Sequence, residues 1–79
     1  MTPEQRYAAI TSTIWWWLPV RWTNGSAWFE VGFGVTETGA DVLVSKDGAA
    51  SVIVTFTDAE LLGEGRLTPA AARARIEAV

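Results

Sequence analysis

Apolar and polar residues alternate over much of this chain with the period of two that is typical of β-strands. The alternation continues on both sides of Asn24-Gly25, a dipeptide that favours a two-residue hairpin loop because both positions accept positive φ. Folding the chain there pairs Thr23 with Ser26 and predicts a long β-hairpin over residues 14–37. In this register apolar residues meet apolar residues on one face.

The two faces of the predicted hairpin carry different side chains, because successive strand residues point to opposite sides. Trp28 shares one face with Trp15 and Trp17, which lie opposite glycines and are expected to cover bare backbone. Pro19 cannot donate a ladder hydrogen bond, so the first strand is expected to be an edge strand or to be bulged there. The other face holds the apolar residues of the second strand, namely Ala27, Phe29, Val31, Phe33 and Val35.

Two further strands are predicted after this hairpin. A tight loop at residues 38–39 leads into a strand over residues 41–46, and a second turn leads into a strand over residues 50–57. A two-residue loop at the second turn would put the hydrophobic faces out of phase. We therefore predict a three-residue loop with Gly48 in a left-handed conformation.

Helix signals flank the predicted strands. Thr2 is suited to be an N-cap, with Pro3 in the first helical position and Gln5 completing a capping box. The end of this helix falls between Ser12 and Trp17, and we place it near Thr13 because the residues that follow alternate as in a strand.

Asp58 is the expected N-cap of one short helical turn that ends at Leu62. Thr68 and Pro69 then predict the start of a last helix, whose apolar stripe is Ala72, Ile76 and Val79. The predicted fold class is α+β: an antiparallel β-meander of three to four strands with an N-terminal and a C-terminal helix (α-β-β-β-β-α), forming a single domain over residues 1–79.

The composition excludes several kinds of chemistry. The 79 residues include no cysteine and no histidine, which rules out disulfides, thiolate zinc sites, a thiol nucleophile and a histidine base. No glycine-rich segment matches a phosphate-binding motif, and most carboxylates lie at turns or helix starts, where capping explains them. We expect a non-enzymatic protein without a metal or a cofactor.

The net charge of −3 disfavours duplex DNA and anionic membranes as partners and is compatible with a basic protein surface. The longest apolar run, Ile14–Val20, is too short to span a membrane, and the first residues lack the features of a secretory signal. We expect a cytoplasmic protein.

Two surfaces are candidates for binding a partner. The first is the tryptophan face of the sheet, where Trp15, Trp17 and Trp28 lie with Leu43 and Ile53. The C-terminal helix could cover this face, or the face could remain exposed. Its border consists of Arg21, Glu30 and Asp41, and Arg21 opposite Trp28 is a candidate cation-π pair or an ordinary edge-strand arginine.

The second candidate surface is acidic. Its carboxylates cluster in sequence around one end of the sheet and the turn that follows it, and they could dock on a basic surface that otherwise binds nucleic acid. A solvated loop end is the alternative interpretation. The residues of this acidic cluster are Glu37, Asp41, Asp58, Glu60 and Glu64.

With a short, acidic, cysteine-free α+β chain, a meander sheet, a Thr2-Pro3 helix start and these loop-end acids, the protein resembles small phage-encoded anti-CRISPR inhibitors. The resemblance is architectural, extends loosely over the whole chain and involves no sequence motif. It implies a protein of the host cytoplasm that binds a CRISPR effector complex, often at its basic nucleic-acid channel, and blocks target recognition.

Two other classes stay open. One is a self-associating module that forms a homodimer through the edge strand over residues 14–23 or through the tryptophan face. The other is an immunity or antitoxin protein that plugs a basic toxin site.

Overall fold

Helix α1 (Pro3–Trp17) opens the computed structural model, which describes residues 1–79. The predicted capping box is confirmed: the Thr2 hydroxyl accepts a hydrogen bond from the Gln5 N–H at 3.1 Å, and the Gln5 side chain accepts one from the Thr2 N–H at 2.8 Å. These two bonds satisfy backbone donors that have no partner within the helix.

The predicted end of this helix near Thr13 is wrong, because α1 continues to Trp17. Ile10, Thr13, Ile14 and Trp17 are all buried, and their spacing is that of one helical face. Residues 14–17 therefore belong to a helix and not to the first strand. Pro19 explains where the helix ends, since the residue before a proline is driven out of the α region, and Leu18 has φ −130°.

Four antiparallel strands follow in the spatial order β1-β2-β3-β4. Their bounds are β1 (Arg21–Asn24), β2 (Ala27–Val35), β3 (Gly39–Lys46) and β4 (Val52–Thr57), and two helices, α2 (Asp58–Leu62) and α3 (Pro69–Glu77), complete the chain. The predicted α+β meander with an N-terminal and a C-terminal helix is confirmed.

The loop of the first hairpin lies one residue later than predicted. Asn24 pairs with Ala27, so the two loop residues are Gly25 and Ser26, and Gly25 has φ +62°. A loop displaced by one residue moves every cross-strand partner by two, which leaves each side chain on its predicted face. Trp22 therefore lies opposite Phe29, and their rings stack with centroids 5.4 Å apart.

The second loop lies one residue earlier than predicted, since Val35 pairs with Ala40 and the Thr36 N–H donates to the Gly39 carbonyl at 2.9 Å. The third connection has the predicted register. Val44 lies opposite Val52, and Gly48 is left-handed with φ +78°. The face of every strand residue from Ala27 onward was thus predictable from the alternation.

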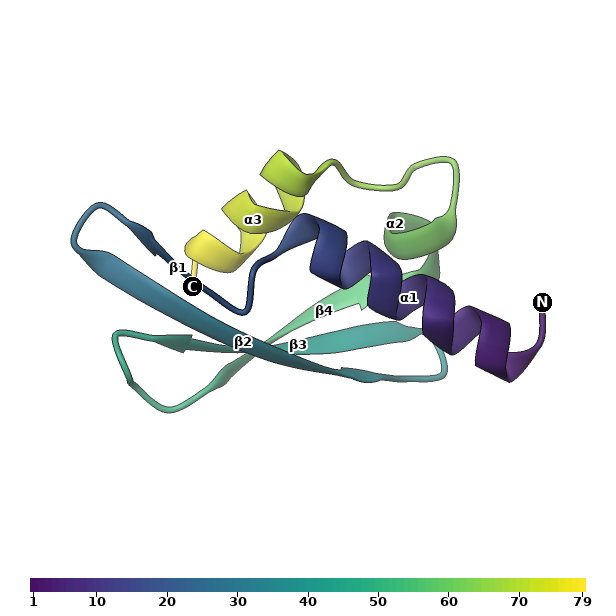
Figure 1. Cartoon of the computed structure of the whole chain (residues 1–79), viewed down its shortest axis with the longest axis horizontal. Helices are drawn as coiled ribbons and strands as arrows, with labels where there is room; N and C mark the ends of the chain where they lie inside the picture. Colours follow the sequence, from purple (N-terminus) through teal and green to yellow (C-terminus); the bar gives the residue numbers. More distant parts are fainter.

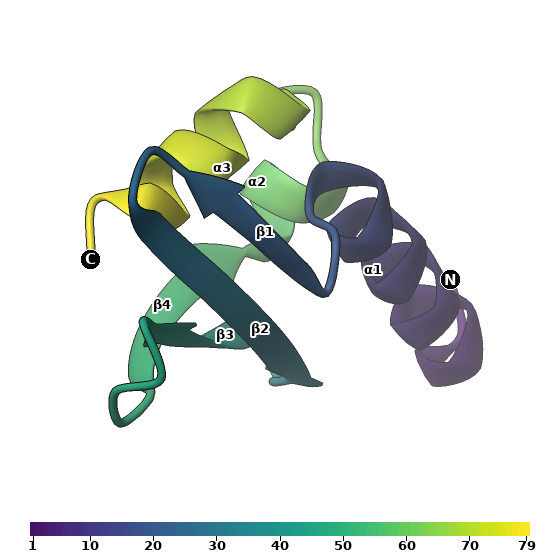
Figure 2. The ribbon, with the colours of Figure 1, turned by 60° about the vertical axis from the view of Figure 1, so that its left-hand side comes forward.

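All three helices lie over one face of the sheet and leave the other bare (Figures 1 and 2). Helix α3 has the predicted Thr68 N-cap and buries Ala72 and Ile76. The N-cap of α2 is Thr57, one residue before the predicted Asp58. None of the helices combines the length and the apolar character needed to cross a membrane. The core between the two layers consists of Ile10, Ile14, Trp17, Leu18, Phe29, Val31, Ala40, Val42, Val44, Phe56, Leu61, Ala72 and Ile76.

Candidate functional site

The face of the sheet that no helix covers, called here the open face, carries an apolar row across three strands. Gly32 of β2 lies opposite Leu43 of β3, which lies opposite Ile53 of β4. Leu43 is 41% exposed and Ile53 is 61% exposed, so the predicted position of both residues on the outer side is confirmed. Of the two alternatives for this face, exposure is correct, because α3 packs on the opposite side (Figure 1).

Trp28 lies at one end of the open face, beside the turn between β3 and β4. A Cβ built on Gly48 would be 3.5 Å from the Trp28 ring. The Trp28 N–H donates to the Asp47 carboxylate, and the Asp47 N–H donates to the Trp28 carbonyl, both at 2.8 Å. The Arg21 guanidinium lies 5.6 Å from the ring centroid, so the cation-π pair is present. Trp28 is thereby held by both of its strand neighbours.

Trp15 and Trp17 are not on the open face, which corrects the sequence-based assignment. Trp17 is fully buried between the layers and donates from its indole N–H to the Leu67 carbonyl at 2.9 Å. Trp15 projects from α1 and meets Phe33 edge-on, with centroids 5.4 Å apart. Because both indoles belong to the covered side, the proposed surface of three tryptophans does not exist, and Trp17 cannot touch a partner.

Gly32 and Gly34 consequently have no ring above them. Neither has a positive φ, and a Cβ built on either would find no atom within 4 Å. By contrast, a Cβ on Gly39 would lie 1.9 Å from the Phe56 carbonyl oxygen. The fold therefore requires glycine at position 39 but not at positions 32 and 34, where a side chain would raise strand propensity at no steric cost.

The acidic cluster is divided by ion pairs inside the molecule. Asp58 binds Arg6 at 2.7 Å, and Glu60 binds Arg75 at 2.5 Å. The hydrogen bond from Arg6 lowers the pKa of Asp58. The hydrogen bond from Arg75, followed by the one from the Thr57 N–H, lowers the pKa of Glu60 to about 2. These two carboxylates hold α1 and α3 against α2, which gives them a structural role.

The other predicted acids are differently placed. Glu37 is exposed in the β2–β3 loop, and Glu64 is exposed beyond α2 on the helical side. Asp41 lies on the open face, where its carboxylate accepts a hydrogen bond from the Thr55 hydroxyl at 3.1 Å. Glu30 lies on the same face and pairs with Arg21 at 2.7 Å. The predicted residues that the structure brings together on one face are therefore Arg21, Trp28, Glu30 and Asp41.

Most of the positive charges have partners inside the molecule, whereas most of the carboxylates form no ion pair. Every arginine has an intramolecular partner: Arg6, Arg21 and Arg75 form ion pairs, while Arg66 and Arg73 lie over tryptophan rings. Only three of the nine carboxylates take part in those ion pairs. The carboxylates without an ion-pair partner are Glu4, Glu37, Asp41, Asp47, Glu64 and Glu77.

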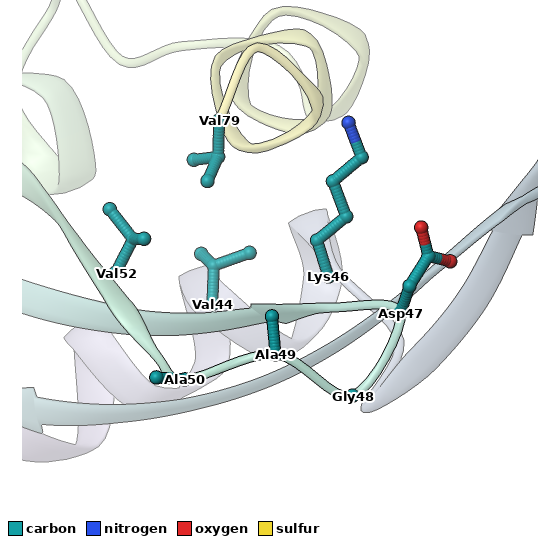
Figure 3. Close-up of a pocket in the computed structure, with 8 residues that line it drawn as sticks. All are labelled: Val44, Lys46, Asp47, Gly48, Ala49, Ala50, Val52 and Val79. Carbon is teal, nitrogen blue, oxygen red and sulfur yellow. The ribbon is translucent and has the colours of Figure 1, made fainter.

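A hollow of about 550 Å³ opens on the covered side, where α3 ends before the sheet does. Val44, Val52 and Val79 point into it, and Lys46 stands at its rim beside the end of α3 (Figure 3). The hollow is broad and mostly apolar, and it leaves Val52 48% exposed. No three acidic side chains lie close enough together to hold a metal ion.

In comparisons with protein-family models, curated proteins and solved structures, nothing matches this chain.

Proposed function

We propose that this protein is a small, non-enzymatic binding protein that docks through its open face on a protein partner with a basic surface. The observation that carries the proposal is the bare strip of Gly32 and Gly34, beside the exposed Leu43 and Ile53. Glycine in a strand interior often marks a bulge, a bend or a close approach by another backbone, and Gly32 and Gly34 lie in a regular ladder without a bulge. Nothing inside this molecule lies within 4 Å of a Cβ built on either glycine, which supports a partner as the approaching chain.

The charge of the open face indicates the chemistry of that partner. Its one arginine is already paired with Glu30, whereas Asp41, opposite Gly34 near one end of the face, and Asp47 at the other end have no ion-pair partner. An apolar centre with unpaired carboxylates is complementary to a surface of Lys and Arg around an apolar contact. In its specific form, following the architectural resemblance, the partner is a CRISPR effector complex, and docking blocks recognition of its nucleic-acid target.

The test measures binding of target DNA by a panel of purified CRISPR effector complexes, with and without the protein. Wild-type protein is expected to inhibit at least one complex, and Asp41→Lys is expected to abolish that inhibition. Glu64→Lys is the matched control, because it makes the same charge change on the helical side of the molecule. Inhibition lost in Glu64→Lys and kept in Asp41→Lys would contradict docking through the open face.

A second pair of variants separates docking from folding. Gly32→Thr is expected to raise the melting temperature and to abolish inhibition, because its side chain occupies the space of the approaching chain. Gly65→Thr introduces the same side chain at a glycine in the loop after α2, where a Cβ also meets nothing within 4 Å. It should leave inhibition intact. A panel in which no complex is inhibited would contradict the effector as partner.

A further inference from the structure

The outer edge of β4 offers backbone hydrogen-bonding groups that nothing in the molecule uses. In an antiparallel ladder, alternate residues direct their N–H and C=O groups to opposite neighbours. The Asp58 N–H donates to the Thr38 carbonyl of the β2–β3 loop. Counting back by twos from Asp58, the backbone N–H and C=O groups of Phe56, Val54 and Val52 therefore also point toward β3. Ile53 and Thr55 therefore direct both of their backbone groups to the open edge.

This edge also lacks the charged residues and prolines that prevent an edge strand from pairing with another chain. Residues 50–57 contain no charged residue and no proline, and they are rich in β-branched side chains. The opposite edge of the sheet differs in each respect. Strand β1 has four residues, it follows Pro19 and begins with the charged Arg21, and Trp15 packs on Phe33 where β2 continues past it.

We propose that two copies of the chain associate through antiparallel pairing of β4 with β4, so that two four-stranded sheets become one continuous sheet across a two-fold axis. The edge is self-complementary, because every residue that meets across it is uncharged and either apolar or β-branched. On the helical side Val54 meets its own counterpart and Val52 meets Phe56 of the second copy, and on the open side Ile53 meets Thr55. A two-fold contact of this type forms a closed dimer. The β1 edges at the two ends of the joined sheet are short and charged, so they do not add further copies.

The free backbone groups define the register. The Thr57 N–H already donates to the Glu60 carboxylate at 2.9 Å, so pairing that depends on it is disfavoured. Pairing Ile53 with Thr55 of the second copy uses all four outward groups of each strand. This register places Val54 on the two-fold axis in a non-hydrogen-bonded pair, where Cα atoms are about 4.5 Å apart. The inference is independent of the proposed function.

The first test is sedimentation equilibrium across the micromolar range, because pairing of one short strand buries a small interface. Wild-type protein is expected to approach twice its 8.6 kDa mass. Thr55→Pro should remain at the single-chain mass, since it removes an outward N–H that has no partner within the chain. Thr55→Val is the matched control: it also loses the hydroxyl bond to Asp41 but keeps the N–H, and it should dimerise.

The second test does not depend on a proline being tolerated. The chain has no cysteine, so a disulfide in Val54→Cys can form only between two copies. The expected Cα separation lies within the range for disulfides, and rapid cross-linking under mild oxidation is expected. Thr23→Cys on β1 supplies an exposed control thiol that should cross-link slowly. Single-chain mass for wild-type protein at all concentrations, or equal cross-linking of both cysteine variants, would overturn the proposal.

Discussion

The two faces of the sheet are built from the same strands but differ in burial. Phe29, Val42 and Phe56 on the covered face are at most 2% exposed, whereas Leu43 and Ile53 on the open face are 41% and 61% exposed. In β3 and β4 apolar residues occur on both faces, as in Val42-Leu43-Val44 and Val52-Ile53-Val54. Hydrophobicity alone therefore does not tell which face is core. The covered face stabilises the fold, and the open face is accessible to solvent.

The largest expected contrast between the faces lies within β4. Phe56→Ala should lower the free energy of unfolding by about 3–5 kcal/mol, because it leaves a cavity beneath the helices, where the ring packs on Trp17. Ile53→Ala, three residues away on the open face, should cost less than about 1 kcal/mol. Urea denaturation of both variants measures the difference. Similar losses at the two positions would mean that the open face is covered in solution.

The glycines give the next contrast, with opposite signs. Gly39→Ala should destabilise the fold by about 1–3 kcal/mol, because its Cβ would collide with the Phe56 carbonyl and push β3 from β4. Gly32→Ala should instead stabilise it by about 0.5–1 kcal/mol, since the new methyl group meets nothing and the unfolded chain loses freedom. Melting temperatures that fall for both variants would contradict the bare open face.

A pH-dependent effect is expected on the covered side. The pKa of Glu60 lies at about 2 in the folded protein, below its ordinary value of 4.5. A carboxyl with a lowered pKa stabilises the fold above its unfolded pKa, and this stabilisation is lost as the pH falls from 4.5 towards 2. Glu60→Gln should lower the free energy of unfolding by on the order of 1 kcal/mol at neutral pH. It should also reduce the loss of stability between pH 4.5 and pH 2, measured by urea denaturation at each pH. Arg75→Gln should reduce this acid-dependent loss of stability as well. If neither variant changes it, the Glu60–Arg75 ion pair is not its cause.

The smallest effect is expected from the ion pair on the open face. Arg21 and Glu30 are 2.7 Å apart, but their side chains are 65% and 42% exposed. Water and salt screen such a pair, so Arg21→Gln should change the free energy of unfolding by no more than about 0.5 kcal/mol. The measurement is urea denaturation beside Arg75→Gln. A larger loss for Arg21→Gln would show that its packing on Trp28 matters more than its charge.

Sequence reasoning succeeded where the signal is local. The Thr2 and Thr68 caps depend on residues within one turn, and the left-handed Gly48 follows from the phase of the two strands beside it. It failed at Trp15 and Trp17. An apolar run of seven residues fits a strand as well as a buried helix, and the helical spacing of Ile10, Ile14 and Trp17 was the signal that could have decided it.

For the candidate site, Leu43, Ile53 and Trp28 were predictable from alternation, but the role assigned to Gly32 and Gly34 was not. They were expected to lie beneath tryptophan rings, and once the two indoles are in α1 the glycines become the bare centre of the open face. The acidic cluster failed for a related reason. Arg6 and Arg75 are far from Asp58 and Glu60 in sequence, so only the folded chain reveals their pairing.

The sequence by itself determined the class of the fold, the starts of the helices and the face to which each residue of β2, β3 and β4 belongs, because these depend on neighbours a few positions away. Only the tertiary structure decided that α1 runs to Trp17, that all three helices pack on the same face of the sheet, and which carboxylates form ion pairs. Those outcomes depend on which apolar surfaces and charges meet across the molecule, and burial is a property of the whole chain.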